Sequence, residues 1–301
     1  RGVYKFPVKD KKSAQYDDHQ CSSYDVEACS WSNIPDEDFA LADDHHWTIG
    51  QFVWTGFDYL GEPSPYDTDA WPNHSSMFGI IDLASLPKDR YYLYRSIWNK
   101  EAETLHILPH WTWPGREGEV TPVFVYTNYP AAELFINGKS YGKQSKNNSS
   151  LKSRYRLMWM DAIYEPGEVK VVAYDKDGKA VAEKSVRTAG KPHHIELVSN
   201  RNELTADGKD LAYVTVKVVD KDGNLCPADS RLINFSVKGA GKYRAGANGD
   251  PTSLDLFHLP KMHAFNGMLT AIVQTNETAG EIILTAKAGG VKAGSIRLLT
   301  K

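Results

Sequence analysis

Residues 51–63 have the sequence QFVWTGFDYLGEP, and this stretch decides the fold of the first third of the chain. It overlaps a mostly apolar run, Thr48–Trp54, of the kind that a strand buried on both faces shows. A helix is predicted before this run, over residues 35–44, because residues 32–33 can form a polar cap and are followed by Pro35 and three acids. After the run come a Gly/Pro/Asp-rich loop over residues 56–76 and a second helix that starts after Pro87. Helix, buried strand, long loop and helix together indicate an α/β unit.

From Thr104 onward the sequence changes to short apolar runs separated by turns, which is typical of an all-β domain. The dipeptides Asn137-Gly138 and Asp177-Gly178 are predicted to form hairpin turns, because both accept positive φ angles at little cost. The basic, polar stretch over residues 143–156 is interpreted as a solvated hairpin. Strands are expected at residues 123–125, 134–136, 157–159 and 169–174.

Residues 188–192 are interpreted as a linker, after which the β pattern returns. Val214, Val216 and Val218 alternate with their neighbours in the way that a half-buried strand does. Six or seven short strands in about 90–110 residues are typical of an immunoglobulin-like sandwich, so we predict two such sandwiches in tandem. The further strands are expected at residues 233–237, 268–273, 282–286 and 296–299.

The composition excludes several classes of protein. The chain has 301 residues, of which 41% are hydrophobic and 24% charged, so it can form two or three domains with ordinary cores. Its formal net charge of −3 gives no electrostatic reason to expect nucleic acid or an anionic membrane as a partner. No stretch approaches the roughly 18 uninterrupted apolar residues of a membrane helix. The cysteines, Cys21, Cys29 and Cys226, are too few for a dense disulfide framework, and their spacing does not indicate zinc.

Trp54, Asp58 and Glu62 form the candidate site that a local search finds. They lie at the carboxyl end of the apolar run and in the loop after it, where barrel enzymes build their active sites. A ring that stacks on a sugar, with carboxylates that bind hydroxyls or act in catalysis, suits carbohydrate chemistry. The alternative interpretation is a buried Trp54 with two acids that tie down the loop. The pairs His45-His46 and His193-His194 do not indicate a metal site, because adjacent side chains point in different directions.

Three segments, residues 51–63, FGIIDL at 78–83 and PKDRYY at 87–92, resemble glycoside hydrolase family 2. The resemblance is strongest to the β-galactosidases of that family from gut Bacteroidetes. It implies that residues 1–102 are the C-terminal remnant of a catalytic (β/α)8 TIM barrel, with the eighth strand and the closing helix. It also implies that residues 103–189 and 190–301 are two accessory immunoglobulin-like β-sandwiches in a multidomain protein.

For the site residues, the resemblance implies that Trp54 lines the subsite of the non-reducing sugar, with Asp58 and Glu62 as substrate-binding residues of the pocket wall. The family's two catalytic glutamates have no match here, so no catalytic residue is expected in this chain. The family's nucleophile lies a few residues before a segment similar to Arg1-Gly2-Val3-Tyr4, so we expect the chain to begin just downstream of it. Some members bind metal ions near the site, but no ligand set maps onto this sequence, and no cofactor is expected.

The resemblance thus implies the C-terminal portion of a retaining exo-β-galactosidase, inactive alone, whose partners are a carbohydrate substrate and the upstream part that completes the barrel. A β-glucuronidase or β-mannosidase of the same family is left open. Two non-catalytic alternatives are a spacer and a carbohydrate-binding module, the latter with an exposed platform of Trp111, Trp113 and Trp159 on the first sandwich. A periplasmic or extracellular location is expected.

Overall fold

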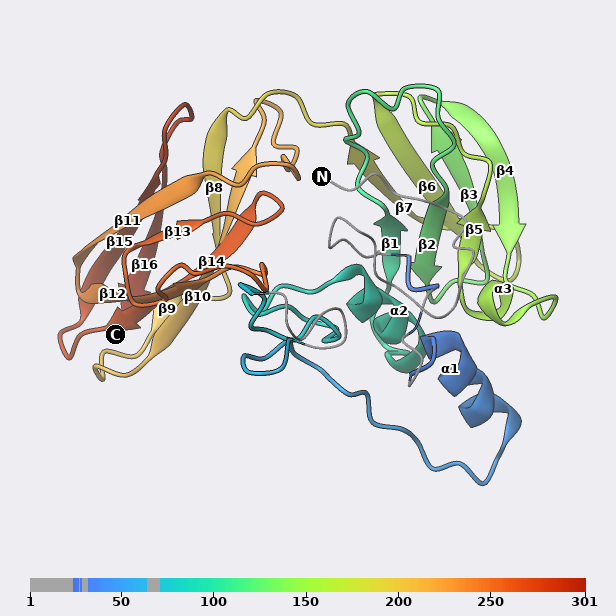
Figure 1. Ribbon diagram of the computed structural model, residues 1–301, viewed down its shortest axis with the longest axis horizontal. Helices are drawn as coiled ribbons and strands as arrows, with labels where there is room; N and C mark the ends of the chain where they lie inside the picture. Colours follow the sequence, from blue (N-terminus) through green and yellow to red (C-terminus); the bar gives the residue numbers. More distant parts are fainter. Residues whose placement is uncertain (1–23, 27, 29–31, 64–70) are drawn as a thin grey trace.

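The computed structural model describes residues 24–26, 28, 32–63 and 71–301. Two β-sandwiches joined by a short linker form most of this part of the chain, and a helical segment lies against the first of them (Figure 1). The expectations for Arg1–Tyr4, Cys21 and Cys29 lie outside the described residues. Within these residues, no helix has the length and apolar character that crossing a membrane requires.

The two helices expected in the N-terminal segment form where the sequence places them. Helix α1 spans Pro35–Asp44, with the proline in its first turn and acidic residues near the positive end of the helix dipole. Its N-cap is Ile34, whose side chain has no polar atom, so the polar cap expected at residues 32–33 is wrong. Helix α2 spans Asp89–Trp98 and begins two residues after Pro87.

The prediction of a strand over Thr48–Trp54 is wrong, because the structure has no strand there. This segment forms no β-bridge with any other described residue, and Ile49 and Phe52 are fully exposed. A strand buried on both faces needs neighbours along its edges and elements over its faces, and the described residues supply neither. The structure therefore does not show the barrel remnant predicted for residues 1–102.

The first sandwich has two antiparallel sheets, as predicted. The three-stranded sheet has the order β1 (Leu105–Leu108), β2 (Val123–Thr127) and β5 (Leu157–Trp159). The four-stranded sheet has the order β4 (Lys139–Ser145), β3 (Ala131–Ile136), β6 (Glu168–Tyr174) and β7 (Ala180–Arg187). A short helix, α3 (Leu151–Tyr155), lies between β4 and β5. The predicted turn at Asn137-Gly138 is confirmed, because its two residues have φ angles of 48° and 81°.

The second sandwich also has two sheets. The first has the order β12 (Gly241–Ala247), β14 (Met268–Thr275), β10 (Leu211–Val219) and β8 (His194–Ser199). The second has the order β13 (Lys261–His263), β11 (Leu232–Gly239), β15 (Gly280–Lys287), β16 (Gly294–Thr300) and β9 (Glu203–Leu204). Val214, Val216 and Val218 of β10 are completely buried, which confirms the predicted alternation. They lie in a core that both sheets share.

The helical segment and the first sandwich share one hydrophobic core. This core contains Phe39 from α1, Leu93 and Tyr94 from α2, and Leu108, Phe124, Tyr126 and Tyr155 from the sandwich. The ring of Phe39 packs edge-to-face against Tyr94 and Tyr155, with centroids 5.1 and 5.3 Å away. Both helices are therefore anchored to the sandwich, since their removal would expose apolar surface on each side.

Candidate functional site

Trp54 lies on the surface at the end of the apolar segment, with 78% of its side chain exposed. Its indole contacts the ring of Tyr59 edge-to-face, with centroids 6.5 Å apart. Tyr59 in turn contacts Phe78 in the same way at 5.9 Å. These three rings form an accessible aromatic surface of the kind on which an apolar sugar face can stack.

Glu62 joins this aromatic surface through Tyr59. The phenol of Tyr59 donates a hydrogen bond to Oε2 of Glu62, and this bond raises the pKa of Tyr59 above its ordinary value. A carboxylate held by one phenol keeps lone pairs free to accept hydrogen bonds from hydroxyl groups. The structure thus brings two predicted site residues, Trp54 and Glu62, together around Tyr59, which the sequence analysis did not select.

Asp58, the third predicted site residue, is buried and has partners on both carboxylate oxygens. Its Oδ1 accepts a hydrogen bond from the backbone N of Gly79 at 2.8 Å, and its Oδ2 pairs with Nζ of Lys88 at 2.6 Å. Burial raises the pKa of the Asp58 carboxyl, although the charge of Lys88 opposes the shift. A Cβ atom at Gly79 would lie 2.3 Å from the backbone N of Asp58, so only glycine allows this approach. Asp58 therefore ties two segments together.

The backbone around these residues forms a folded unit, residues 54–63 and 71–88, that we call the site loop. Thr55 and Gly56 accept hydrogen bonds from Ile80 and Ile81 at 3.1 and 3.0 Å. Further along, the amide of Gly61 donates to the carbonyl of His74 at 2.9 Å. The positions of Trp54 and Glu62 therefore depend on residues 74–81, which lie across the loop from them.

Asp82 holds the far end of the site loop, and the sequence analysis did not select it. Its Oδ1 accepts hydrogen bonds from the backbone amides of Ala84 and Leu86, both at 2.8 Å. Burial raises the pKa of the Asp82 carboxyl to about 6, against the effect of these two bonds. The signal available in the sequence is an aspartate that precedes a short turn, where its side chain commonly binds the following amides.

The platform of exposed tryptophans on the first sandwich is wrong. Trp111 and Trp159 are each only 1% exposed, and their indole N–H groups donate to the carbonyls of Glu165 and Gly142, both at 2.9 Å. Trp113 is partly buried and packs against the same core. These rings fill the interior between the two sheets, where large aromatic side chains contribute most to stability.

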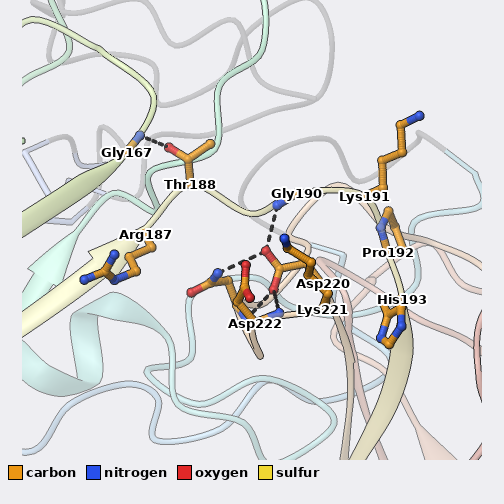
Figure 2. Close-up of a pocket in the computed structure, with 11 residues that line it drawn as sticks. Gly167, Arg187, Thr188, Gly190, Lys191, Pro192, His193, Asp220, Lys221 and Asp222 are labelled. Carbon is orange, nitrogen blue, oxygen red and sulfur yellow. Dashed lines mark hydrogen bonds between the residues drawn. The ribbon is translucent and has the colours of Figure 1, made fainter.

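The linker between the sandwiches borders an open cleft of about 690 Å3 (Figure 2). Its central carboxylate, Asp220, accepts hydrogen bonds from the backbone of Gly190 at 2.8 Å and from the side chain of Asn224 at 3.0 Å. Burial alone would raise the pKa of Asp220, but these bonds lower it to about 2. His193 and His194 contact each other here, but no group of three metal-binding side chains forms within the described part of the chain. Asp220 therefore fastens the linker.

Comparison with known proteins relates both sandwiches to known families. The family model for glycoside hydrolase family 2 C-terminal domain 5 matches residues 195–297, and that of a domain of unknown function (DUF4982) matches residues 118–182. The chain is 42% identical to the beta-galactosidase BoGH2A of Bacteroides ovatus, over 98% of this chain and 34% of that protein. It is 25% identical to a beta-glucuronidase of Formosa agariphila, over 88% of this chain and 27% of that protein.

The fold is also similar to that of a solved enzyme. The crystal structure of a beta-glycosidase from Bacteroides vulgatus matches with a TM-score of 0.84 and 32% identity, over 94% of this chain and 34% of that one. The chain therefore spans about a third or less of the length of the proteins it matches.

Proposed function

Since the chain belongs to glycoside hydrolase family 2, we propose that it is the C-terminal portion of a retaining exo-β-galactosidase and supplies one wall of the sugar-binding site. The observation that carries this proposal is the accessible cluster of Trp54, Tyr59 and Glu62. The name of the Bacteroides ovatus relative supports the galactoside as substrate.

Each residue of the cluster has a role that its geometry allows. The exposed indole of Trp54 stacks on the C–H face of the terminal sugar, and Glu62 accepts hydrogen bonds from sugar hydroxyls. Tyr59 orients both residues, because its ring supports the indole and its hydroxyl holds the carboxylate. Asp58 positions the loop through Gly79 and Lys88 and does not contact the sugar.

The bond cleavage itself needs two further carboxyl groups. In a retaining mechanism, one glutamate attacks the anomeric carbon to form a glycosyl-enzyme, while the other protonates the leaving oxygen and then activates water. We assign both glutamates to the part of the protein upstream of this chain. The exposed side chains of Ile49 and Phe52 form the surface on which that part packs, since their burial would remove them from water.

A β-glucuronide is the second candidate substrate, because a beta-glucuronidase is among the similar proteins. The charge of Glu62 disfavours it, since a uronic acid would place a second carboxylate near the same cluster. Lys88, which belongs to the site loop, is already paired with Asp58 at 2.6 Å and is not free to neutralise a uronate.

The replacement Trp54→Ala in the full-length protein tests the proposal. We expect kcat/KM for an aryl β-galactoside to fall at least about tenfold, equivalent to about 1.4 kcal/mol, with little change in melting temperature. The matched control is Trp47→Ala, which removes an exposed indole that stacks on His45 and has no contact with Tyr59. Unchanged kinetics in a well-folded Trp54→Ala protein would overturn the role of this cluster.

A further inference from the structure

The site loop does not end freely in solvent, because its far side lies against the second sandwich (Figure 1). The hydroxyl of Thr270, on β14, donates a hydrogen bond of 2.7 Å to the carbonyl of Ala84, and this bond is buried. A second contact links the amide of His74 to the carbonyl of Pro251 at 3.1 Å. Two points of the loop are therefore fixed by a domain almost two hundred positions further along the chain.

A glycine allows the two parts to approach this closely. A Cβ atom at Gly249 would lie 2.2 Å from Oδ2 of Asp82, which is less than any ordinary contact. The Asp82 carboxylate cannot swing aside without cost, because its other oxygen binds the amides of Ala84 and Leu86. The backbone of Gly249 has no positive φ angle, so its requirement for glycine comes from this contact alone.

The docked points lie across the loop from the sugar-binding cluster. The amide of His74 donates to the carbonyl of Pro251, and the carbonyl of His74 accepts a hydrogen bond from the amide of Gly61, the residue before Glu62. Ile81, the residue before Asp82, donates to Gly56, two residues after Trp54. Each loop segment that contacts the second sandwich is therefore linked by one hydrogen bond to the segment that carries Trp54 or Glu62.

The docking contact does not fill all the space between the loop and the second sandwich. A hollow of about 210 Å3 lies beside it, bounded by residues 84–86 of the loop and by residues of β8 and β10. Beside this hollow, the contact includes specific interactions at Thr270, Pro251 and Gly249. We expect a substitution at Thr270 or Gly249 to weaken the contact, whereas Pro251 takes part only through its backbone carbonyl.

We propose that the second sandwich positions the site loop, so that affinity for the sugar depends on the docking of Gly249 and Thr270 against residues 82–84. Gly249 and Thr270 are positioning residues in this proposal and do not contact substrate. The docking itself stands apart from the enzymatic role, whereas its effect on sugar affinity rests on the proposed function.

The docking is tested by amide hydrogen exchange on the full-length protein. The variant Gly249→Ala adds a methyl group against Asp82, and Thr270→Val removes the hydroxyl with little change of shape. The control is Gly289→Ala, since a Cβ atom there meets nothing within 4 Å. We expect the two docking variants to lose protection at the amides of residues 74–86, and the control to keep it. Unchanged protection in both docking variants would overturn the proposal.

Kinetics with an aryl β-galactoside test the effect on the site. A misplacement of the loop should raise KM and lower kcat/KM about 10- to 100-fold in Gly249→Ala, while kcat changes less. Trp54→Ala is assayed beside it to separate two failures. If Trp54→Ala is impaired and Gly249→Ala is not, the positioning role is wrong. If Trp54→Ala is itself unaffected, the proposed function fails, and the exchange measurement still decides the docking.

Discussion

Arg156 and Asp36 form an ion pair with no solvent exposure on either side chain, and it joins the first sandwich to α1. Nε of Arg156 lies 3.1 Å from Oδ1 of Asp36, and one terminal nitrogen donates to the carbonyl of Tyr24 at 2.8 Å. The guanidinium also packs over the ring of Tyr126, 5.3 Å from its centroid. The pair thus adds a polar fastening to the apolar core that the helices and the sandwich share.

Removal of one partner of this ion pair should strongly lower the stability of the fold. In Asp36→Ala, Arg156 stays buried without its counter-charge, and we expect a loss of about 3–5 kcal/mol in the free energy of unfolding. Urea denaturation measures it. The comparison variant is Asp44→Ala, which breaks an exposed pair with Arg154 and should cost much less. Equal losses in the two variants would show that the buried pair does not anchor α1.

Limited proteolysis should cut the described N-terminal segment at one place. We expect the first cleavage within residues 47–53, which are largely exposed and have no strand partner, while α1 and α2 resist. Native mass spectrometry should find the fragment that carries α1 still bound to the rest of the isolated chain. In Asp36→Ala the same fragment should dissociate. Early cleavage inside α2 would contradict the shared core.

The stability of the site loop should depend on pH through Asp82. Its folded-state pKa of about 6 lies above the ordinary value of 3.8, so the folded loop binds the proton more tightly than the open one. The stabilisation is complete below pH 3.8 and is lost as pH rises through about 6. In Asp82→Asn, the amide oxygen can still accept hydrogen bonds from Ala84 and Leu86, and the pH dependence should weaken to the part that Asp58 contributes. Hydrogen exchange at the amides of Ala84 and Leu86, corrected for the intrinsic exchange rate, measures the stability of the loop at each pH. The same change of stability with pH in the wild-type and Asp82→Asn proteins would contradict the prediction.

Glu62→Gln should change substrate preference in the full-length protein. The amide oxygen can still accept the hydrogen bond of Tyr59, but the negative charge is gone. We expect the ratio of kcat/KM for an aryl β-glucuronide to that for the galactoside to rise about fivefold, since the repulsion of a uronate amounts to about 1 kcal/mol in a solvated site. Paired assays on the two substrates measure the ratio. A common factor on both substrates would mean that the charge of Glu62 does not act on the uronate.

The 301-residue chain alone should not hydrolyse aryl β-galactosides. Because we assign the nucleophile and the acid/base glutamate to the upstream part, we expect the chain alone to form no covalent intermediate and not to protonate the leaving group, and general acid–base catalysis alone is worth roughly 10²–10⁴-fold. The assay uses the purified chain beside the full-length protein. Turnover of about 1–1000 s⁻¹ by the chain would return Asp58 and Glu62 to candidacy as catalytic residues.

Local patterns were enough to predict the sandwiches. The alternation at Val214, Val216 and Val218 and the turn at Asn137-Gly138 are set by residues close in sequence, and both are confirmed. The strand over residues 48–54 needs partners that the described residues do not supply, so its apolar pattern alone was misleading. An apolar run shows that a segment needs cover without showing what covers it.

Local sequence patterns could not predict side chains whose partners lie far away in the sequence. The sequence around Trp111 and Trp159 does not distinguish a sugar platform from a buried core. Only the packing of the two sheets places these side chains inside. Arg156 lies in a basic, polar stretch that was interpreted as solvated, yet it is buried because Asp36 is there to meet it. In the candidate site, Trp54 and Glu62 came from the sequence, whereas Tyr59 became a site residue only when its contacts were known.

The hydrogen bond from Thr270 to Ala84 also sets an order of events during protein synthesis. The two residues are separated by 186 positions, and a ribosome adds about 5–20 residues per second, so roughly 10–40 s pass between them. During that interval the nascent site loop has no second sandwich to dock against. A chain that stalls or is cut before β14 emerges would thus keep Trp54 and Glu62 while their loop lacks an anchor, so synthesis of the second sandwich completes the arrangement of residues almost two hundred positions before it.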